Sequence, residues 1–354
     1  MAVPADFLII GGGAVGMTSA LALLRAGYRV TLLERGQTGR EASWAGGGIL
    51  SPLCSWDYLD SVTQLSQRSM GMFPAAMAEL HEATGVDPEY KRSGMLVLPP
   101  YPHEQAVAWC QRHQVACQPA TLPDSDRAGL LLPDVAQVRN PRLLRALRLR
   151  VQQLGGQILE QHEVLRLHVQ GEEVVALETL HGDYSAANYV LAAGSWSQTL
   201  LPPELALNLH VQPVRGQILL LKFDTPPLPH IVVQQRLYLI PRRDGHVLIG
   251  STLEEAGFDK STTEAARAEL WQQTLQLLPH WQDRPIVQHW AGLRPGSAHN
   301  IPTIGRHPYL RNLYANTGHF RYGVTMSLAS AELLLHEIEQ RPQPLEISPY
   351  RWQA

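Results

Sequence analysis

The first 35 residues follow a pattern of strand, turn, helix and strand. Residues 7–10 are a continuous apolar run, which is typical of a parallel strand covered on both faces. A glycine-rich turn at 11–16 follows, and the helical pattern after it ends near Gly27, where a helix C-cap belongs. Residues 28–33 predict a second strand. This order predicts a βαβ unit in a parallel sheet.

Later segments predict elements that return to this sheet. Asn140 is expected to cap a helix that has Pro141 in its first position. An apolar strand at 189–194 ends in Gly194. A strand at 312–315 leads through another glycine-rich turn into a helix with apolar positions 324, 328, 331 and 335. We therefore expect a sheet assembled from pieces that lie far apart in the sequence.

The segments between these pieces predict a second domain. Residues 86–136 are rich in proline and polar residues, and the runs 217–222, 236–241 and 246–251 look like antiparallel strands. The expected fold class is α/β, with a Rossmann-type domain on a parallel sheet and an α+β domain on an antiparallel sheet. The predicted boundaries are residues 1–85, 137–207 and 292–354 for the first domain, and residues 86–136 and 208–291 for the second.

Composition narrows the function classes. The chain has 354 residues, of which 45% are hydrophobic and 17% charged, so it can form a core and is not disordered. Its 29 Lys and Arg against 32 Asp and Glu give a net charge of -3, which argues against nucleic acid or anionic lipid as partners. Three cysteines without CxxC spacing predict neither a disulfide framework nor a zinc site, and they favour a cytoplasmic location.

One uncharged stretch, residues 7–24, reaches the lower length limit of a membrane span. Four glycines interrupt it and no basic segment precedes it, so we expect neither membrane insertion nor a signal peptide. The histidines lack i, i+4 pairing, and no metal site is expected.

The glycine turn carries the first chemical signal. Gly11, Gly13 and Gly16 have G-x-G-x-x-G spacing, which lets backbone N–H groups approach a pyrophosphate at a helix N-terminus. Glu34 ends the second strand, where a carboxylate accepts hydrogen bonds from ribose hydroxyls. The glycines alone would also suit a simple tight turn. The strand, helix and acid in register favour dinucleotide binding.

Two more turns favour FAD over a nicotinamide cofactor. A second glycine cluster at 40–49 suits a long, buried cofactor that passes this loop, although a surface loop is the alternative. The turn 317–323 precedes a helix whose positive end would favour the negative charge of a reduced flavin. An ordinary strand-to-helix turn is the alternative there.

These motifs together resemble the glycine oxidase branch of the D-amino acid oxidase family of flavoproteins. The motifs stand in family order over nearly the whole chain: the turn 11–16 with Glu34, the loop 40–48, and the runs 213–217, 290–295 and 318–321. The resemblance implies a glutathione-reductase-like FAD domain joined to a substrate domain with a curved antiparallel sheet. It also implies noncovalent FAD, because the cysteine that links flavin in sarcosine oxidases has no match, and a homo-oligomer, commonly a tetramer.

The activity implied by the resemblance is oxidation of a small amino acid. Hydride passes from Cα to flavin N5, and O2 reoxidises the flavin, giving an imine or 2-oxo acid, ammonia and hydrogen peroxide. Enzymes of this branch supply dehydroglycine for thiamine thiazole synthesis. The resemblance leaves open whether glycine, sarcosine or a small D-amino acid is preferred.

The resemblance and the glycine turns assign residues to two roles. Arg294 falls on the carboxylate-binding arginine, Tyr238 on a tyrosine lining the site, and Arg321 where glycine oxidases also touch the substrate. The residues expected to bind FAD are Gly11, Gly13, Ala14, Val15, Gly16, Glu34, Arg35, Ala42, Ser43, Gly47, Gly48, Ile49, Val164, Gly194, His319, Phe320, Arg321, Tyr322, Gly323, Val324 and Thr325. Two residues depart from the family pattern: Tyr322 is larger than expected, and Arg236 stands where a neutral residue or histidine is expected.

The chemistry explains why an arginine is needed. Hydride transfer requires no protein base at carbon, but the substrate must be aligned, and a planar guanidinium grips a carboxylate with two hydrogen bonds. A structural ion pair is the alternative role for Arg294.

Two other functions remain open. One is an FAD-dependent D-amino acid dehydrogenase that passes electrons to a quinone, and the other is a non-catalytic or RNA-modifying FAD-binding protein. The net charge and Arg294 weigh against the second.

Overall fold

The first sheet has six strands. The computed structural model describes residues 5–354, so residues 1–4 of the predicted segment 1–85 lie outside the described residues. The strand order is β19-β20-β13-β1-β2-β9, and all neighbours are parallel except β19 and β20. The strands are β1 (Ala5–Ile10), β2 (Val30–Leu33), β9 (Gln157–Leu159), β13 (Ala186–Leu191), β19 (Thr303–Arg306) and β20 (Leu313–Thr317).

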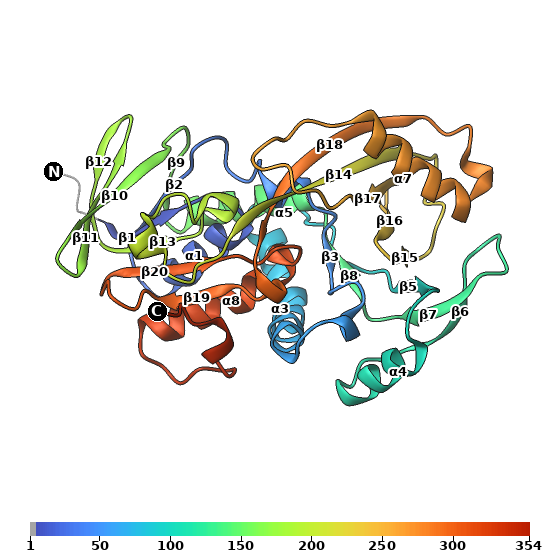
Figure 1. The fold of residues 1–354 in the computed structure, drawn as a ribbon, viewed down its shortest axis with the longest axis horizontal. Coiled ribbons are helices and arrows are strands. Elements are labelled where there is room, and N and C mark those ends of the chain that lie inside the picture. The colour runs from blue at the N-terminus through green and yellow to red at the C-terminus, as the bar shows by residue number, and fades with distance from the viewer. Residues whose placement is uncertain (1–4) are drawn as a thin grey trace.

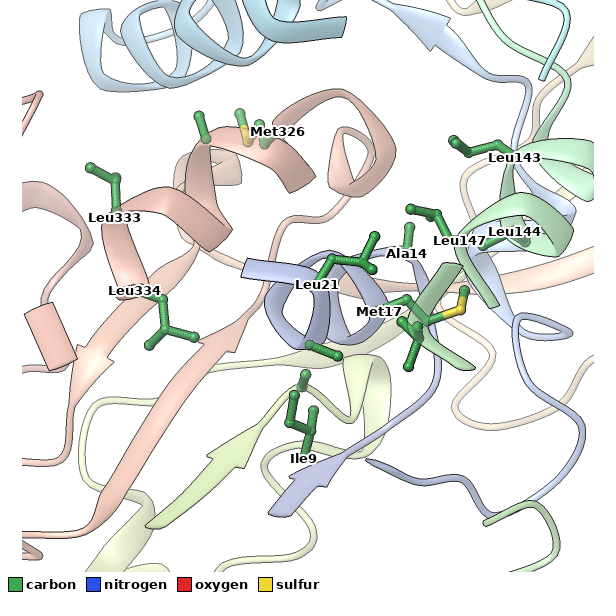
Figure 2. Packing of buried hydrophobic residues seen from close by; sticks show 14 of the residues in the cluster. Ile9, Ala14, Met17, Leu21, Leu143, Leu144, Leu147, Met326, Leu333 and Leu334 are labelled. Atoms are coloured by element: carbon green, nitrogen blue, oxygen red, sulfur yellow. The ribbon is translucent and has the colours of Figure 1, made fainter. Parts of the chain in front are cut away.

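Side chains of β1 enter two cores, because successive residues of a strand point to opposite faces. Phe7 and Ile9 pack among helices, and Figure 2 shows Ile9 beneath apolar side chains of α1, with those of α5 and α8 nearby. Leu8 and Ile10 pack against a three-stranded sheet on the other face. The helices are α1 (Ala14–Arg25), α3 (Asp60–Thr84), α5 (Asn140–Gln153) and α8 (Gly323–Ile338), and the strands of the small sheet are β10 (Val164–Gln170), β11 (Glu173–Thr179) and β12 (Gly182–Tyr184).

The second large sheet has eight strands in the order β18-β14-β17-β16-β15-β5-β7-β6 and lies beside the first in Figure 1. Its neighbours are antiparallel except β15 and β5. Helix α7 (Glu264–Leu277) packs on one face and α4 (His103–Arg112) on the other. The strands are β5 (Met95–Leu98), β6 (Gln118–Thr121), β7 (Ala128–Leu132), β14 (Gln212–Lys222), β15 (Ile231–Gln234), β16 (Leu237–Pro241), β17 (His246–Gly250) and β18 (Ile286–Gly296).

Short elements connect the two sheets. Strands β3 (Ile49–Leu50), β8 (Ala136–Gln137) and β4 (Lys91–Arg92) form a small sheet between them. The remaining helices are α2 (Ala42–Ala45), α6 (Pro203–Ala206) and the 3₁₀ turns Ser55–Asp57, Gly194–Trp196, Pro279–Trp281, Ala298–Asn300 and Ser348–Tyr350. Among residues 5–354, no helix combines the length and apolar character that crossing a membrane requires.

The expected fold class is confirmed, and so is the sheet built from distant pieces. The division into two domains at the stated boundaries stays a prediction, and β18 crosses the boundary predicted after residue 291. The second predicted strand begins at Val30 rather than residue 28. The predicted strand 236–241 begins at Leu237, because residues 235 and 236 form a tight turn in which Gln235 has a φ of 53°.

One predicted helix cap is wrong. Arg139 is the N-cap of α5, and Asn140 is the first helical residue. The Asn140 amide instead donates hydrogen bonds to the carbonyl oxygens of Ser43 (2.7 Å) and Gly46 (3.0 Å). Asn140 therefore anchors the second glycine loop and does not cap the N-terminus of α5.

We predict opposite effects for two Gly→Ala substitutions in helices. A Cβ on Gly16 would lie 1.9 Å from the Gly11 carbonyl oxygen, so Gly16→Ala should lower the free energy of unfolding by about 1–3 kcal/mol. Gly71 in α3 has open space around it, so Gly71→Ala should raise that free energy by about 0.5–1 kcal/mol through helix propensity. Urea unfolding of both variants tests the close approach of Gly16 to Gly11. Equal changes in the free energy of unfolding for the two variants would contradict it.

Candidate active site

A cavity of about 410 Å³ is bordered by residues of both large sheets. Its volume lies within the roughly 300–1,000 Å³ range of ligand pockets. The three predicted turns contribute residues 11–13 and 15, residues 41–43 and 45–49, and residues 317–325 to its wall. The antiparallel sheet contributes Tyr238 and Arg294. The fold thus brings together turns whose residues lie as far apart in the sequence as Gly11 and Thr325.

The first turn depends on glycine for a close backbone approach. Gly11 has a φ of 109°, and a Cβ there would lie 2.4 Å from the carbonyl oxygen of Ala192. Helix α1 begins directly after this turn, so its first N–H groups lie beside the cavity wall. A helix N-terminus with free N–H groups is a site for phosphate.

Glu34 lies at the end of β2 and is almost fully buried. Its carboxylate accepts hydrogen bonds from the N–H groups of Gly12 and Gly36, each 2.8 Å long. Burial raises the pKa of Glu34, and the two N–H groups only partly oppose this effect. The buried carboxylate would be further stabilised by additional donors, such as the two hydroxyls of a ribose.

The second turn is fastened to the first and to α5. The Ala14 N–H donates to the Ser43 hydroxyl (2.9 Å), and Asn140 holds the carbonyl groups of Ser43 and Gly46. Gly48 has a φ of 71°, and a Cβ there would lie 2.2 Å from the Val138 carbonyl oxygen. Only glycine allows this loop to lie so close to the backbone of Val138.

The third turn begins α8 and touches the second. The Thr325 hydroxyl donates to the Ile49 carbonyl oxygen over 2.9 Å. His319 is buried, and burial lowers its pKa to about 3, so its imidazole is neutral. The neutral ring can offer one donor and one acceptor to a ligand.

Arg294 reaches the cavity from β18 through a gap left by a glycine. Gly216 on β14 lies next to Arg294, and a Cβ there would lie 2.0 Å from the Nη2 atom. The guanidinium donates to the Ser251 hydroxyl (2.6 Å) and to the carbonyl oxygens of Thr252 (3.1 Å) and Arg215 (3.4 Å). These neutral acceptors fix the orientation of the side chain without neutralising its charge.

No carboxylate within residues 5–354 forms an ion pair with Arg294. Burial lowers the pKa of the guanidinium, and nearby Tyr238 opposes this effect. A partly buried charge without a counterion is only partly solvated, so an anion that enters the cavity would be bound strongly here.

Tyr238 lies on β16 and is buried on the face opposite α7, because Leu237 and Leu239 take that face. A Cβ on Gly250 would lie 2.6 Å from the Tyr238 hydroxyl, so this glycine makes room for the ring. Arg321 also borders the cavity, from the turn before α8. Its guanidinium packs 5.5 Å from the ring of Phe320.

Most of the predicted site residues border one cavity. Ala14 and Gly16 do not; they lie buried in the first turn of α1, where Gly16 permits contact with Gly11. The predicted residues in the cavity wall are Gly11, Gly13, Val15, Glu34, Arg35, Ala42, Ser43, Gly47, Gly48, Ile49, Val164, Gly194, Tyr238, Arg294, His319, Phe320, Arg321, Tyr322, Gly323, Val324 and Thr325.

Sequence reasoning missed several residues of the wall. Ser251 holds Arg294, Asn140 holds the second loop, and Trp196 lies 3.8 Å from the Arg35 guanidinium. The serine and the tryptophan have no local pattern that signals their role. The position of Asn140 beside a proline signalled only a helix start.

The donors and acceptors of the cavity fit FAD. Three buried polar atoms in its wall have no hydrogen-bond partner within residues 5–354: Asn140 Oδ1, Asn316 Oδ1 and His319 Nε2. Because buried polar groups are nearly always hydrogen-bonded, these atoms indicate a polar ligand. The acid at Glu34, the N–H groups at two helix starts and the apolar walls match a nucleotide joined to a planar ring system.

Known proteins support this assignment. A profile of the FAD dependent oxidoreductase family matches residues 6–336. A glycine oxidase from Pseudomonas aeruginosa is 42% identical over 354 residues, covering 97% of both chains. A bifunctional protein ThiO/ThiG from Trichormus variabilis is 31% identical, and its match covers 96% of this chain and 54% of the relative.

Solved structures agree with the sequence relatives. Glycine oxidase from Geobacillus kaustophilus superposes with a TM-score of 0.93 at 25% identity, covering 99% of both chains. Glycine oxidase from Bacillus cereus gives a TM-score of 0.88 at 28% identity, covering 96% of both chains. The chain therefore belongs to the FAD-dependent oxidoreductases of the D-amino acid oxidase family, and it is an FAD-dependent amino acid oxidase.

Proposed function

We propose that this protein oxidises glycine, or a similarly small amino acid such as sarcosine or a small D-amino acid, with O2 as the final electron acceptor. The products are an imine that hydrolyses to a 2-oxo acid and ammonia, and hydrogen peroxide. The similarity to proteins named glycine oxidase supports the choice of substrate. The relatives named ThiO/ThiG support a role in supplying dehydroglycine for thiamine thiazole synthesis.

The observation that carries this proposal is the partly buried guanidinium of Arg294, whose hydrogen-bond partners among residues 5–354 are all neutral. A substrate carboxylate supplies the missing counterion. Two charge-assisted hydrogen bonds of about 1.5–3 kcal/mol each would then fix the substrate. The Tyr238 hydroxyl borders the same space and is the second group assigned to substrate binding.

When bound, FAD supplies the acceptor for the two electrons and the hydrogen of the Cα–H bond and delivers the electrons to O2. The protein's own contribution is alignment and exclusion of water. Arg294 fixes the carboxylate, and the buried walls around Tyr238 and Ile218 limit the access of water. His319 is neutral at physiological pH, so its imidazole does not repel the substrate amine electrostatically.

The three turns are assigned to the cofactor. Glu34 binds the ribose hydroxyls, the start of α1 binds the pyrophosphate, and the start of α8 lies at the flavin. The cavity wall contains no cysteine among the described residues, which supports noncovalent binding. The proposed division assigns FAD to the first domain and the substrate to the second, with β18 continuing across the boundary given after residue 291.

Two further assignments concern the cell and the assembly. Cys54, Cys110 and Cys117 are free thiols, which supports a reducing compartment such as the cytoplasm. A homo-oligomer, with a tetramer as the first expectation, remains a prediction from the resemblance.

Glycine added without oxygen to the yellow holoprotein should bleach the flavin absorbance. Admitting air should then restore the colour and release hydrogen peroxide in an amount equal to the glycine oxidised. If an artificial quinone accepts the electrons and no peroxide forms, the protein is a dehydrogenase. If no small amino acid bleaches the flavin, the proposed substrate class is wrong.

Replacing Arg294 should separate substrate binding from cofactor binding. Arg294→Ala should lower kcat/KM for glycine by about 10²–10⁴-fold, the equivalent of two charge-assisted hydrogen bonds. The variant should retain FAD, because the hydrogen bonds of Arg294 within residues 5–354 go to Ser251, Thr252 and Arg215 and not to the three turns assigned to the cofactor. Arg145→Ala, on the exposed face of α5, is the matched control. Unchanged turnover at low glycine concentration would remove Arg294 from the site.

Replacing Glu34 should affect only the cofactor. Glu34→Gln keeps the size of the side chain but removes its charge, so the Kd for FAD should rise by about tenfold, equivalent to about 1.4 kcal/mol. Titration of the apoprotein with FAD, followed by flavin fluorescence, gives this Kd. Glu82→Gln, on the exposed surface of α3, controls for the loss of a negative charge. The same Kd in both variants would contradict the role of Glu34.

A further inference from the structure

A second cavity adjoins the proposed substrate site. This outer chamber has a volume of about 320 Å³ and shares Leu53 and Arg321 with the main cavity. Arg321 therefore borders both spaces. It also lies near Arg294, whose pKa is lowered mainly by burial and further by Arg321. A substrate whose carboxylate is held by Arg294 is consequently close to the outer chamber.

The walls of the outer chamber are tied together by hydrogen bonds. Gln234 donates to the carbonyl oxygen of Pro99 (2.7 Å), which joins the β15–β16 turn to residues 100–102. Gln105 donates to the carbonyl oxygen of Trp56 (3.1 Å), which joins α4 to the segment 53–58. The Tyr322 and Tyr58 hydroxyls are joined over 2.5 Å. The chamber is therefore a preformed space between tied segments.

The outer chamber carries an excess of positive charge. Arg236 is at the tip of the β15–β16 turn and Arg321 is at the inner end, and neither forms an ion pair or side-chain hydrogen bond within the described chain. Asp57 is the acidic residue in this wall. Within residues 5–354, Asp57 forms no ion pair with either arginine, and burial raises the pKa of its carboxyl. The chamber wall thus carries two guanidinium groups and one carboxylate, and neither guanidinium forms an ion pair with that carboxylate.

We propose that the outer chamber binds a second acidic group of the substrate, a proposal that rests on the proposed amino acid oxidation. Arg294 would hold the α-carboxylate while Arg321 and Arg236 receive a second carboxylate, attached to the amine or to Cα. The preferred substrates are then small amino acids with two acidic groups. Neutral analogues of similar size would bind through Arg294 alone.

Paired substrates test this preference directly. Iminodiacetate is compared with sarcosine, and D-aspartate with D-alanine, by kcat/KM of the holoenzyme. We expect the acidic member of at least one pair to have the higher kcat/KM, mainly through a lower KM, and the advantage to shrink in 0.5 M salt because charge interactions are screened. The two pairs distinguish attachment at the amine from attachment at Cα. A higher kcat/KM for the neutral member of both pairs would overturn the proposal.

Two substitutions assign the preference to the outer chamber. Arg236→Gln should reduce the ratio of acidic to neutral kcat/KM by about three- to fivefold, as expected for an exposed charge pair. Asp57→Asn should raise that ratio, because it removes the opposing charge. Arg145→Gln on α5 is the matched control and should leave the ratio unchanged. If the ratio is the same in wild type and Arg236→Gln, the chamber is not the acid site.

A binding measurement separates this proposal from the proposed function. Malonate and acetate do not transfer hydride, and their Kd values follow from the change in flavin absorbance on titration. Malonate should bind more tightly than acetate in wild type, with the difference reduced in Arg236→Gln. Equal affinities alongside normal glycine turnover would refute the outer chamber only. Absence of turnover with every amino acid would refute the proposed function as well.

Discussion

The site depends on one partly buried guanidinium that the protein orients but does not neutralise. Arg294 donates to a serine hydroxyl and two backbone carbonyl oxygens, and no acid of the described chain reaches it. Carrying such a charge costs stability, because desolvation is not repaid by a counterion. This loss of stability is offset when an anionic ligand binds and forms an ion pair with Arg294. The same feature that weakens the empty protein therefore gives affinity for a carboxylate.

The glycines explain how this charge reaches the cofactor cavity. Gly216 makes room for the guanidinium, and Gly292 lets β18 lie against α2, where a Cβ would come 2.4 Å from that of Ala45. The Trp290 indole donates to the Ala45 carbonyl oxygen (3.1 Å), and Lys260 pairs with Glu41 (2.9 Å). The strand that carries Arg294 is thus attached directly to the second glycine loop. Substrate and cofactor contacts are made by one connected piece of backbone.

The sequence predicted what is encoded locally. The apolar run at β1, the glycine spacing after it and Glu34 in register all lie within about one βαβ unit, so their pattern is readable. Arg294 has no such pattern and was reached only through resemblance to a family. Ser251 and Asn140 were missed because their partners lie 43 and 97 positions away. Helix α3 was not predicted, although its buried positions 62, 65, 66, 69, 73, 77 and 80 have helical spacing, because Gly71 and Pro74 interrupt it.

The central claim is that Arg294 recognises negative charge rather than shape. The most direct test compares glycolate with glycolamide, which have nearly the same size but differ in charge, by titrating the oxidised holoprotein and following flavin absorbance. The account predicts that glycolate binds at least about a hundredfold more tightly, since the charged partner pairs with a partly buried cation. Equal affinity for the neutral amide would contradict it.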